Sequence, residues 1–381
     1  MERLKEDMTV MIDKKRLLDT FLSYVQIDSE SLNERAMMER VSEDLRALGA
    51  EVWFDDSGSA VGSNGGNVYA RLEGGLDMEP MLFSAHLDTV KPGNGVKPVV
   101  EDGVVRSSGD TILGGDDKSG VSGIMEALRT VTEKKVPHRT IEVLFTICEE
   151  IGLRGAKHAD FGKLSAKRAV VLDSSGDAGK IITSAPGQNK FLATVIGRTA
   201  HAGIAPEQGI SAIQVASEAI AAMKLLRIDE ETTANFGSFV SEYATNIVPE
   251  RAKLVGEVRS RDTEKLKAQT EHMKRCLEDA CARHGATLEC EIETAYLAYG
   301  FSEDDELVRE VKDACARIGV SATTAASGGG SDANVMNLSG VKAVVLGTGM
   351  DKVHTTSERI TVRNLEDTAR LCFALMTGQG A

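Results

Sequence analysis

The stretch TIEVLFTICEEIGLRGA, from Thr140 to Ala156, ends an apolar run with two adjacent glutamates. Its apolar part, TIEVLFTI, has the length and composition of a buried strand. Burying a carboxylate without a partner is costly, and a second like charge beside it raises that cost. Glu149 and Glu150 therefore need a positive partner, which is either a basic side chain or a metal ion.

The composition describes a globular chain with enough apolar residues for a large core. Of its 381 residues, 42% are apolar and 27% are charged, and this length favours one large domain with a smaller one. The net charge of −14 argues against nucleic acid and anionic membranes as partners. No stretch resembles a signal sequence or a membrane span, and the six cysteines form no CxxC pair. We therefore expect buried, reduced thiols and a cytoplasmic location.

Helical and strand patterns alternate through the first half of the chain. Helical spacing appears over residues 17–25 and 37–48, and strand-like runs follow at NVYARL and PMLFSAHLDTV. A glycine-rich turn, LGGDDKSG, opens a further helix, and AVVLD at 169–173 is another strand after TIEVLFTI. Strands that alternate with helices predict an α/β fold with a mainly parallel sheet covered on both faces.

The middle of the chain has a different pattern. The strand KFLATVIG, the helix GISAIQVASEAIAAMKLL, the strand AKLVGEVRSRD, a charged helix over 263–284 and the strand LECEIETAYLA follow one another. This β-α-β-α-β order predicts a compact α+β unit, after which the α/β pattern returns. We therefore predict a discontinuous large domain, 1–186 and 299–381, with a smaller α+β domain inserted at 187–298.

Histidine and acidic residues recur where predicted strands or the glycine-rich turn end. Because ligands bind beyond the carboxyl ends of strands in open α/β sheets, we expect these residues to share one crevice. Mixed nitrogen and oxygen ligands suit zinc, and also cobalt or manganese. Each short motif alone has an ordinary structural explanation, but five of them in this arrangement predict a metal site. They contribute His86 and Asp88, Asp116 and Asp117, Glu149 and Glu150, Asp173, and His354.

These motifs, together with GRTAHAGIAPEQGISAI, GGGSDANVMN and VHTTSERI, resemble those of the co-catalytic zinc peptidases. That family includes peptidase T, glutamate carboxypeptidase and aminoacylase, and the closest likeness is to the peptidase T-like branch. The resemblance covers nearly the whole chain. It implies a catalytic domain built on a mainly parallel sheet, and an inserted α+β domain that serves as a lid or in dimerisation.

The resemblance also implies two divalent metal ions, with zinc preferred and cobalt or manganese as alternatives. Asp116 would bridge the two ions. His86 and Asp173 would complete the protein ligands of one ion, and Glu150 and His354 those of the other. The peptide bond that follows Asp116 is cis in the family.

Three further residues receive catalytic roles from the same resemblance. Asp88 would orient the imidazole of His86, and Glu149 would act as the general base for a water held between the metals. His201, in TAHAG, would stabilise the oxyanion, and in dimeric relatives this histidine comes from the other subunit.

Substrate contacts are implied for residues in three other segments. Arg259 matches an arginine that binds the substrate's carboxylate, although a plain surface ion pair would also explain it. The glycines of GGGSD could let a ligand approach the backbone or could form an ordinary sharp turn. The residues with these implied contacts are Asn246, Arg259, Gly329 and Ser331.

The function implied is hydrolysis of a peptide bond in small peptides, with tripeptide aminopeptidase activity favoured. Carboxypeptidase and N-acyl amino acid deacylase activity use the same metal core and remain alternatives, as does a non-catalytic binding relative. A relative that had lost catalysis should lack some metal ligands or the general base, yet the five predicted ligands, Asp88 and Glu149 are all present here. For assembly, the TAHAG segment favours a monomer or a homodimer through the inserted domain over the hollow complexes of related aminopeptidases.

Overall fold

A nine-stranded mixed sheet forms the centre of the larger part of the molecule in the computed structural model, which describes residues 12–380. The strand order is β1-β2-β6-β3-β7-β16-β8-β14, and β15 also pairs with β8. The bounds are β1 Glu51–Phe54, β2 Val68–Leu72, β3 Met81–His86, β6 Ile141–Thr146, β7 Arg168–Ser174, β8 Lys180–Ala185, β14 Tyr299–Gly300, β15 Thr323–Ala326 and β16 Lys342–Gly347. A separate small sheet has the order β17-β5-β4, with β4 Pro98–Glu101, β5 Val104–Ser107 and β17 Arg359–Thr361.

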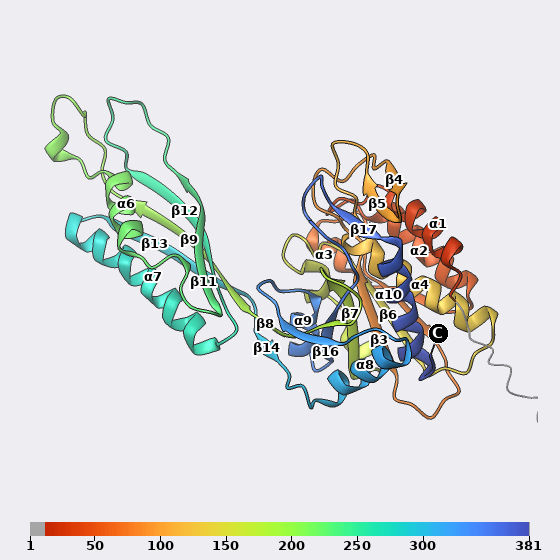
Figure 1. Ribbon diagram of the computed structural model, residues 1–381. Coiled ribbons are helices and arrows are strands. Elements are labelled where there is room, and N and C mark those ends of the chain that lie inside the picture. The colour runs from red at the N-terminus through yellow and green to blue at the C-terminus, as the bar shows by residue number, and fades with distance from the viewer. Residues whose placement is uncertain (1–11, 381) are drawn as a thin grey trace, which may run out of the picture. The chain divides into compact units, whose positions relative to one another are not determined.

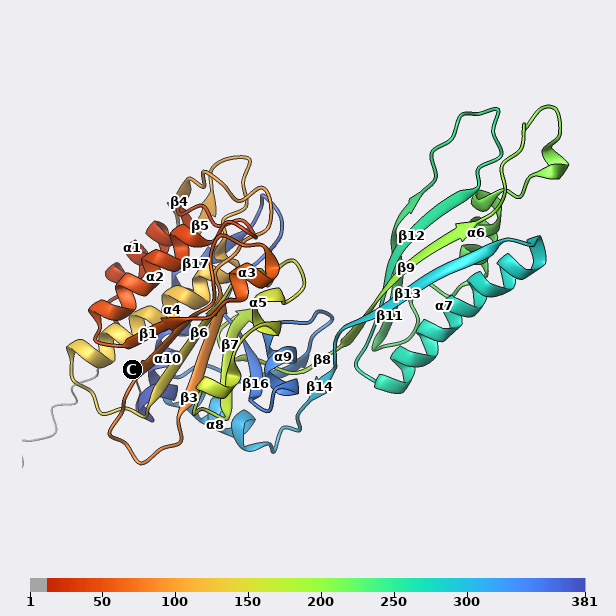
Figure 2. The ribbon, with the colours of Figure 1, turned by 180° about the vertical axis from the view of Figure 1, so that it is seen from behind.

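The four middle strands of this sheet, β6, β3, β7 and β16, run parallel, which confirms the predicted fold class. Every residue of β3 and β6 is buried, because helices lie on either side of the sheet (Figures 1 and 2). The helix α4 packs on β3, β7, α1 and α10. The helices are α1 Lys14–Val25, α2 Arg35–Ala47, α3 Ser57–Val61, α4 Gly115–Glu133, α5 Arg154–Lys157, α8 Glu306–Arg317, α9 Asp332–Leu338 and α10 Val362–Thr377, with a short 3-10 helix at Phe161–Lys163.

A second, five-stranded antiparallel sheet has the order β10-β11-β12-β9-β13. Its elements are β9 Gly187–Ile196, a 3-10 helix Pro206–Gln208, α6 Ala212–Ala222, β10 Leu226–Arg227, β11 Thr232–Val240, β12 Arg251–Ser260, α7 Thr263–His284 and β13 Thr287–Tyr296. Buried and exposed residues alternate along β12, so the sheet buries one face. That face carries a core of its own with α6 and α7, in which Phe191, Leu254 and Leu277 are buried.

The predicted β-α-β-α-β order of this region is incomplete, because β10 and β11 lie between α6 and β12. The strand β11 has the sequence TTANFGSFV, in which only two residues are fully buried. Its register with β12 also shifts between Phe236 and Ser238. A half-exposed strand with a glycine and an irregular register carries little of the alternating pattern that identifies strands in a sequence.

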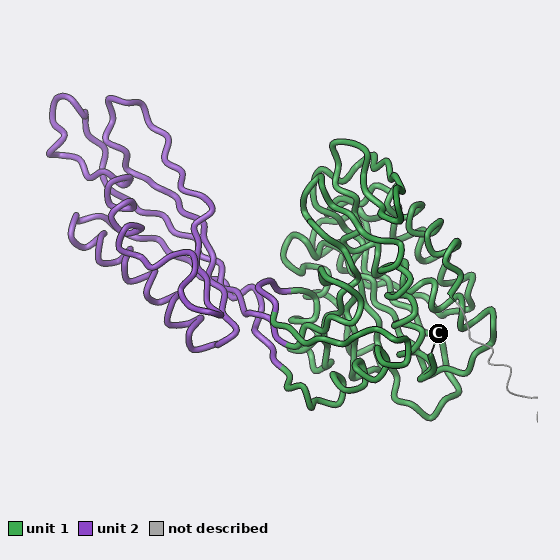
Figure 3. Tube along the Cα trace, in the orientation of Figure 1, with its two compact units in different colours: residues 1–183, 301–326, 331–381 green, residues 184–300, 327–330 purple. Residues whose placement is uncertain are grey.

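The chain divides into two compact units (Figure 3). The larger holds the described residues before 184, residues 301–326 and the residues from 331 onward, and the smaller holds Ser184–Gly300 and Ser327–Gly330. The predicted insertion, 187–298, falls inside the smaller unit, which also contains residues 327–330, although the sequence places these in the larger domain. Gly330 explains this difference, because a Cβ at that position would lie 2.4 Å from the Tyr296 ring of β13. A lid or dimerisation role for the smaller unit stays a prediction.

The six cysteines are all free, as the sequence predicted. Four are buried, but Cys276 and Cys290 are only partly buried, which differs from the expectation that all would be. Among residues 12–380, no helix has the length and apolar character needed to cross a membrane. The cytoplasmic location stays a prediction.

Candidate active site

The carboxyl ends of the parallel strands bring the predicted ligands to one edge of the sheet. His86 is the last residue of β3 and lies opposite Thr146, the last residue of β6, in the parallel register. Glu149 and Glu150 follow β6 within four residues, and Asp173 lies at the end of β7. Asp116 comes from the first turn of α4, where the Asp116–Asp117 peptide bond is cis, as the family resemblance implied.

Two groups of side chains form at this edge, and they share Asp116. His86 Nε2 lies 3.0 Å from Asp116 Oδ1 and 3.8 Å from Asp173 Oδ1. His354 Nε2 lies 3.3 Å from Asp116 Oδ2 and 2.9 Å from Glu150 Oε1. The two oxygens of Asp116 therefore face different imidazoles. This grouping matches the predicted division of ligands between two ions with Asp116 as the bridge.

These separations suit a pair of zinc-type ions. Ligand atoms that lie about 2.0–2.2 Å from a tetrahedral ion lie roughly 3.3–3.6 Å from one another. The four separations within the two groups, of which two involve Asp116, run from 2.9 to 3.8 Å. Ligand atoms of His86, Asp116 and Glu150 also lie within 4.8 Å of one another, as do those of His86, Asp117 and Asp173. The donor set is entirely nitrogen and oxygen, which suits zinc, cobalt or manganese.

The site has more carboxylates than positive groups. Within residues 12–380, its acidic side chains form ion pairs with His86 and His354 but none with a lysine or arginine. Burial, and then repulsion by Asp173, holds the pKa of Glu149 well above its usual range. Hydrogen bonds to Asp116 and Glu150 raise the pKa of His354 to about 10. The raised pKa values favour the protonated forms of Glu149 and His354, which lowers the negative charge of the cluster. Bound divalent cations would supply positive charge in place of these protons. The acidic residues are Asp88, Asp116, Asp117, Glu149, Glu150 and Asp173.

Asp117 has a ligand atom near those of His86 and Asp173, but its carboxylate also binds the backbone. Its Oδ2 accepts the backbone N–H of His86 at 3.2 Å, and its Oδ1 accepts that of Gly120 at 3.3 Å. Both carboxylate oxygens are thus occupied by backbone donors. The sequence assigns the bridging role to Asp116, and that role stays a prediction.

Asp88 makes different contacts from those expected. His86 Nδ1 lies 2.9 Å from the backbone carbonyl oxygen of Asp88 but 3.6 Å from its carboxylate. The carbonyl therefore accepts the Nδ1 proton, which leaves Nε2 free to face the metal site. The carboxylate instead accepts the backbone N–H groups of Glu149 and Glu150, at 2.9 and 3.3 Å.

Glu149 is suited to moving a proton. It is 9% exposed, and its carboxylate makes no hydrogen bond or ion pair to a protein group within the described chain, whereas Glu150 binds His354. Cys148, beside it, is buried, and burial followed by its hydrogen bond to Glu34 raises the pKa of its thiol. A buried thiol with a raised pKa stays protonated, which argues against Cys148 as a nucleophile.

Two residues that hold this loop were not singled out from the sequence. The fully buried Glu34 accepts the backbone N–H of Cys148 at 3.1 Å and its thiol at 3.0 Å. Ser31 donates its hydroxyl to Asp88 at 2.6 Å. Their segment, IDSESLNERA, belongs to the family resemblance, but these contacts span 57 and 114 residues, so no local spacing reveals them.

The remaining predicted site residues divide between the two units. His201, Asn246, Arg259 and Gly329 belong to the smaller unit and Ser331 to the larger. The Asn246 carbonyl accepts the N–H of Ala202, so the His201 and Asn246 loops are neighbours. Arg259 binds Glu257 through two contacts, of 2.8 and 3.0 Å, which is the ion pair considered as its alternative explanation. The substrate and oxyanion roles of these residues stay predictions.

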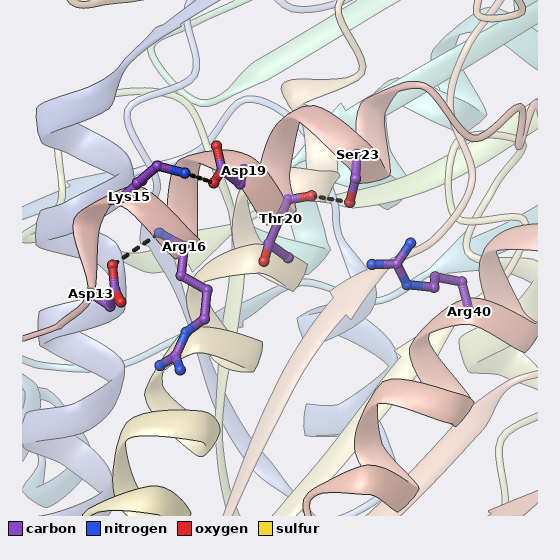
Figure 4. Close-up of a pocket in the computed structure, with 7 residues that line it drawn as sticks. All are labelled: Asp13, Lys15, Arg16, Asp19, Thr20, Ser23 and Arg40. Atoms are coloured by element: carbon purple, nitrogen blue, oxygen red, sulfur yellow. Dashed lines mark hydrogen bonds and ion pairs between the residues drawn. The ribbon is translucent and has the colours of Figure 1, made fainter.

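Hollows in the larger unit include two with room for small molecules. One, of about 360 Å³, lies on α1 and is lined mainly by charged residues, of which Lys15 and Asp19 pair with each other (Figure 4). Arg16 there binds Glu126 and Glu133, and Arg40 binds Asp44, so the hollow is explained as an ion-paired surface. The other, of about 580 Å³, includes Ser175 and Gly176 after β7 and Met350 and Asp351 before His354. Part of its lining therefore comes from residues close in sequence to the predicted ligands Asp173 and His354.

Comparisons with known proteins identify the family of the chain. The model of Peptidase family M20/M25/M40 matches residues 82–377, and the chain belongs to that family. It is accordingly a hydrolase of the peptidase class, and the family resemblance seen in the sequence is confirmed.

The similar proteins match over nearly their whole length. The structure of aminopeptidase PepT from Bacillus cereus ATCC 10987 has 42% identity and a TM-score of 0.90, with 96% of this chain and 99% of that one covered. A tripeptidase from Staphylococcus aureus subsp. aureus Mu50 has 38% identity and a TM-score of 0.93, with 96% and 98% covered. The uncharacterized protein YqjE from Bacillus subtilis (strain 168) is 43% identical over 366 residues, with 96% and 99% covered.

Proposed function

We propose that this chain is a two-metal aminopeptidase that removes the amino-terminal residue of small peptides, tripeptides in particular. The observation that carries the proposal is the pair of ligand groups joined by Asp116, with the unpartnered Glu149 beside them. The similarity to an aminopeptidase PepT and to a tripeptidase, at 42% and 38% identity, supports the substrate class.

The chemistry divides between the ions and the side chains. When bound, two divalent ions would lower the pKa of a water toward neutrality and polarise the amide carbonyl. The Glu149 carboxylate would take the proton of the attacking water and then give it to the leaving amine nitrogen. Asp88 would keep Glu149 in place through its backbone N–H, and burial of the base keeps bulk water from competing for the proton.

The two adjacent glutamates give the sharpest test of this division. Glu149→Gln should retain both metals and substrate affinity but lose turnover by about 100-fold or more, because only the base is removed. Glu150→Gln should instead lower the occupancy of one metal, since its Oε1 belongs to the His354 group. Metal content by mass spectrometry and kcat would be measured for both variants. Loss of metal from Glu149→Gln, with Glu150→Gln unaffected, would reverse the assignment.

The scissile bond needs a separate experiment. Purified protein would be incubated with dipeptides, tripeptides, amino-blocked peptides and N-acyl amino acids. Release of a free amino-terminal residue from tripeptides alone would support the proposal, whereas release of a carboxy-terminal residue or of an acyl group would favour a carboxypeptidase or a deacylase. His201→Ala and Arg259→Ala, assayed with the same panel, should lower activity without loss of metal if their predicted roles hold.

Assembly as a homodimer through the smaller unit and a cytoplasmic location complete the proposal. Sedimentation velocity would test the first of these. A species of about twice the 40.7 kDa chain mass is expected, and a dodecamer-sized species would contradict it.

A further inference from the structure

The first turn of α4 obtains its capping group from a distant part of the chain. The first N–H groups of a helix have no partner within the helix and need an outside acceptor. The N-cap residue of α4 is Gly114, which has no side chain to provide one. The sequence LGGDD therefore leaves several backbone donors together, directly before the bridging ligand Asp116.

The carboxylate of Glu358 meets these donors. Its Oε2 accepts the N–H groups of Leu113 and Gly114, both at 2.8 Å, and its Oε1 accepts that of Asp116 at 2.9 Å. Glu358 is 1% exposed. These contacts span 242 to 245 residues of sequence.

The two glycines of LGGDD make room for this carboxylate. Gly114 has a φ of +74°, in the region that favours glycine. A Cβ on Gly115 would lie 3.1 Å from Glu358 Oε1, which is tighter than ordinary contact. The backbone of this turn therefore fits closely around the Glu358 carboxylate.

The same short segment also carries a predicted ligand. His354 Nε2 lies 3.3 Å from Asp116 Oδ2, while Glu358, four residues later, binds the backbone of Asp116. Residues 354–358 therefore fix both the side chain and the main chain of the bridging residue.

We propose that Glu358 is a positioning residue of the metal centre, which holds the main chain of Asp116 so that its two carboxylate oxygens face His86 and His354. This inference rests on the proposed two-metal function. It also predicts that an amide cannot replace the carboxylate. N–H donors occupy both oxygens of Glu358, and the NH₂ group of a glutamine would point a donor at one of them.

A second buried glutamate gives a matched control. Glu142 in β6 is also fully buried and accepts the backbone N–H groups of Ser165 and Ala166, at 3.0 and 2.8 Å. None of its partners is a predicted metal ligand. Glu142 also pairs with Arg71, so Glu142→Gln sets an upper limit on the general cost of replacing a buried, backbone-binding carboxylate.

The test compares metal affinity rather than activity. Metal-free wild type, Glu358→Gln and Glu142→Gln would be titrated with Co²⁺ and Zn²⁺ against a competing chelator, with circular dichroism as the check of folding. Glu358→Gln should bind about 10- to 100-fold more weakly, the usual effect of losing an outer partner of a ligand. Its bound Co²⁺ should also show an altered absorption spectrum, and Glu142→Gln should match wild type in both.

Each outcome decides between the two proposals. If wild type binds no metal, the proposed function fails. If wild type binds metal but Glu358→Gln binds it equally well, or if both variants weaken alike, the role of Glu358 is overturned. Gly115→Ala would decide the matter if Glu358→Gln does not fold, because its methyl group presses on Oε1. Weaker metal binding by Gly115→Ala supports the inference, and unchanged binding overturns it.

Discussion

Glu149 and Glu150 are neighbours in sequence, but their side chains have different environments. Glu150 binds His354, whereas the carboxylate of Glu149 has no protein partner in the described chain. Their backbone N–H groups both donate to Asp88, and that of the preceding Cys148 donates to Glu34. Three consecutive amides are thus held by two buried carboxylates. This main-chain support holds the two adjacent side chains in different environments.

Replacing Glu34 tests this support at the level of one residue. Glu34→Ala should lower kcat by on the order of 100-fold, because a small displacement of the base is costly, while KM and metal content stay near wild type. Glu34→Gln should restore most of the activity. Its amide oxygen can accept from Cys148, and its NH₂ can donate to the Ser63 hydroxyl, which already contacts the Glu34 carboxylate.

Steady-state kinetics with metal analysis would check this prediction, with Glu142→Ala as the control for the loss of a buried carboxylate. Equal losses of kcat in Glu34→Ala and Glu142→Ala would indicate a general stability effect instead. The contrast with Glu358 is informative, since glutamine should rescue at position 34 but not at 358.

The limits of prediction from sequence are visible in these residues. Four of the five predicted ligands sit at or just after a strand end or at a glycine-rich turn, where fold rules place binding sites. His354 instead lies in the loop after β16 and was indicated by the VHTTSERI motif. Glu34 and Glu358 could not be found in this way, because their roles depend on which backbone N–H groups remain unpaired after folding. The contact between His86 and Asp88 was equally hard to predict, because both the backbone carbonyl and the carboxylate of Asp88 can accept the Nδ1 proton of His86.

At the scale of elements, predictability followed the strength of the local pattern. The helix α7 occupies the predicted range, 263–284, because its apolar spacing is bounded by a capping aspartate and by Gly285. The strand β11 was missed because half-burial and a register shift remove its alternation. Similarly, residues 327–330 joined the smaller unit through a contact with Tyr296 that no local pattern indicates.

The cap of α7 should contribute measurably to the stability of the smaller unit. The Asp262 side chain accepts the N–H groups of Glu264 and Lys265, at 2.8 and 3.0 Å. Asp262→Ala should lower the free energy of unfolding by about 0.5–2 kcal/mol, since those donors lose their acceptor. Urea denaturation would measure this, with Asp279→Ala on the exposed surface of the same helix as the control. A loss no larger than that of the control would show that the cap contributes little.

At the scale of the whole molecule, the distribution of charge links metal binding to stability. The chain carries a net charge of −14, and acidic groups are concentrated without lysine or arginine partners in the larger unit. Protons partly offset this repulsion, as the raised pKa values of Glu149 and Asp173 indicate, both caused first by burial. Divalent cations bound there would stabilise the folded state by mass action.

This stabilisation should be local to one unit. All five predicted metal ligands belong to the larger unit, while the smaller unit has a separate hydrophobic core around Phe191 and Leu277. Adding zinc to metal-free protein should therefore slow hydrogen exchange in the segments around 86–88, 113–118, 148–150 and 172–174, and around 352–358. Exchange in α7 and β13 should change little, because zinc stabilises only the states whose ligands are assembled.

Exchange measured by mass spectrometry with and without zinc would check this, and Glu150→Gln should reduce the protection around 352–358 most. Equal protection of both units, or none in either, would contradict a metal centre confined to these ligands.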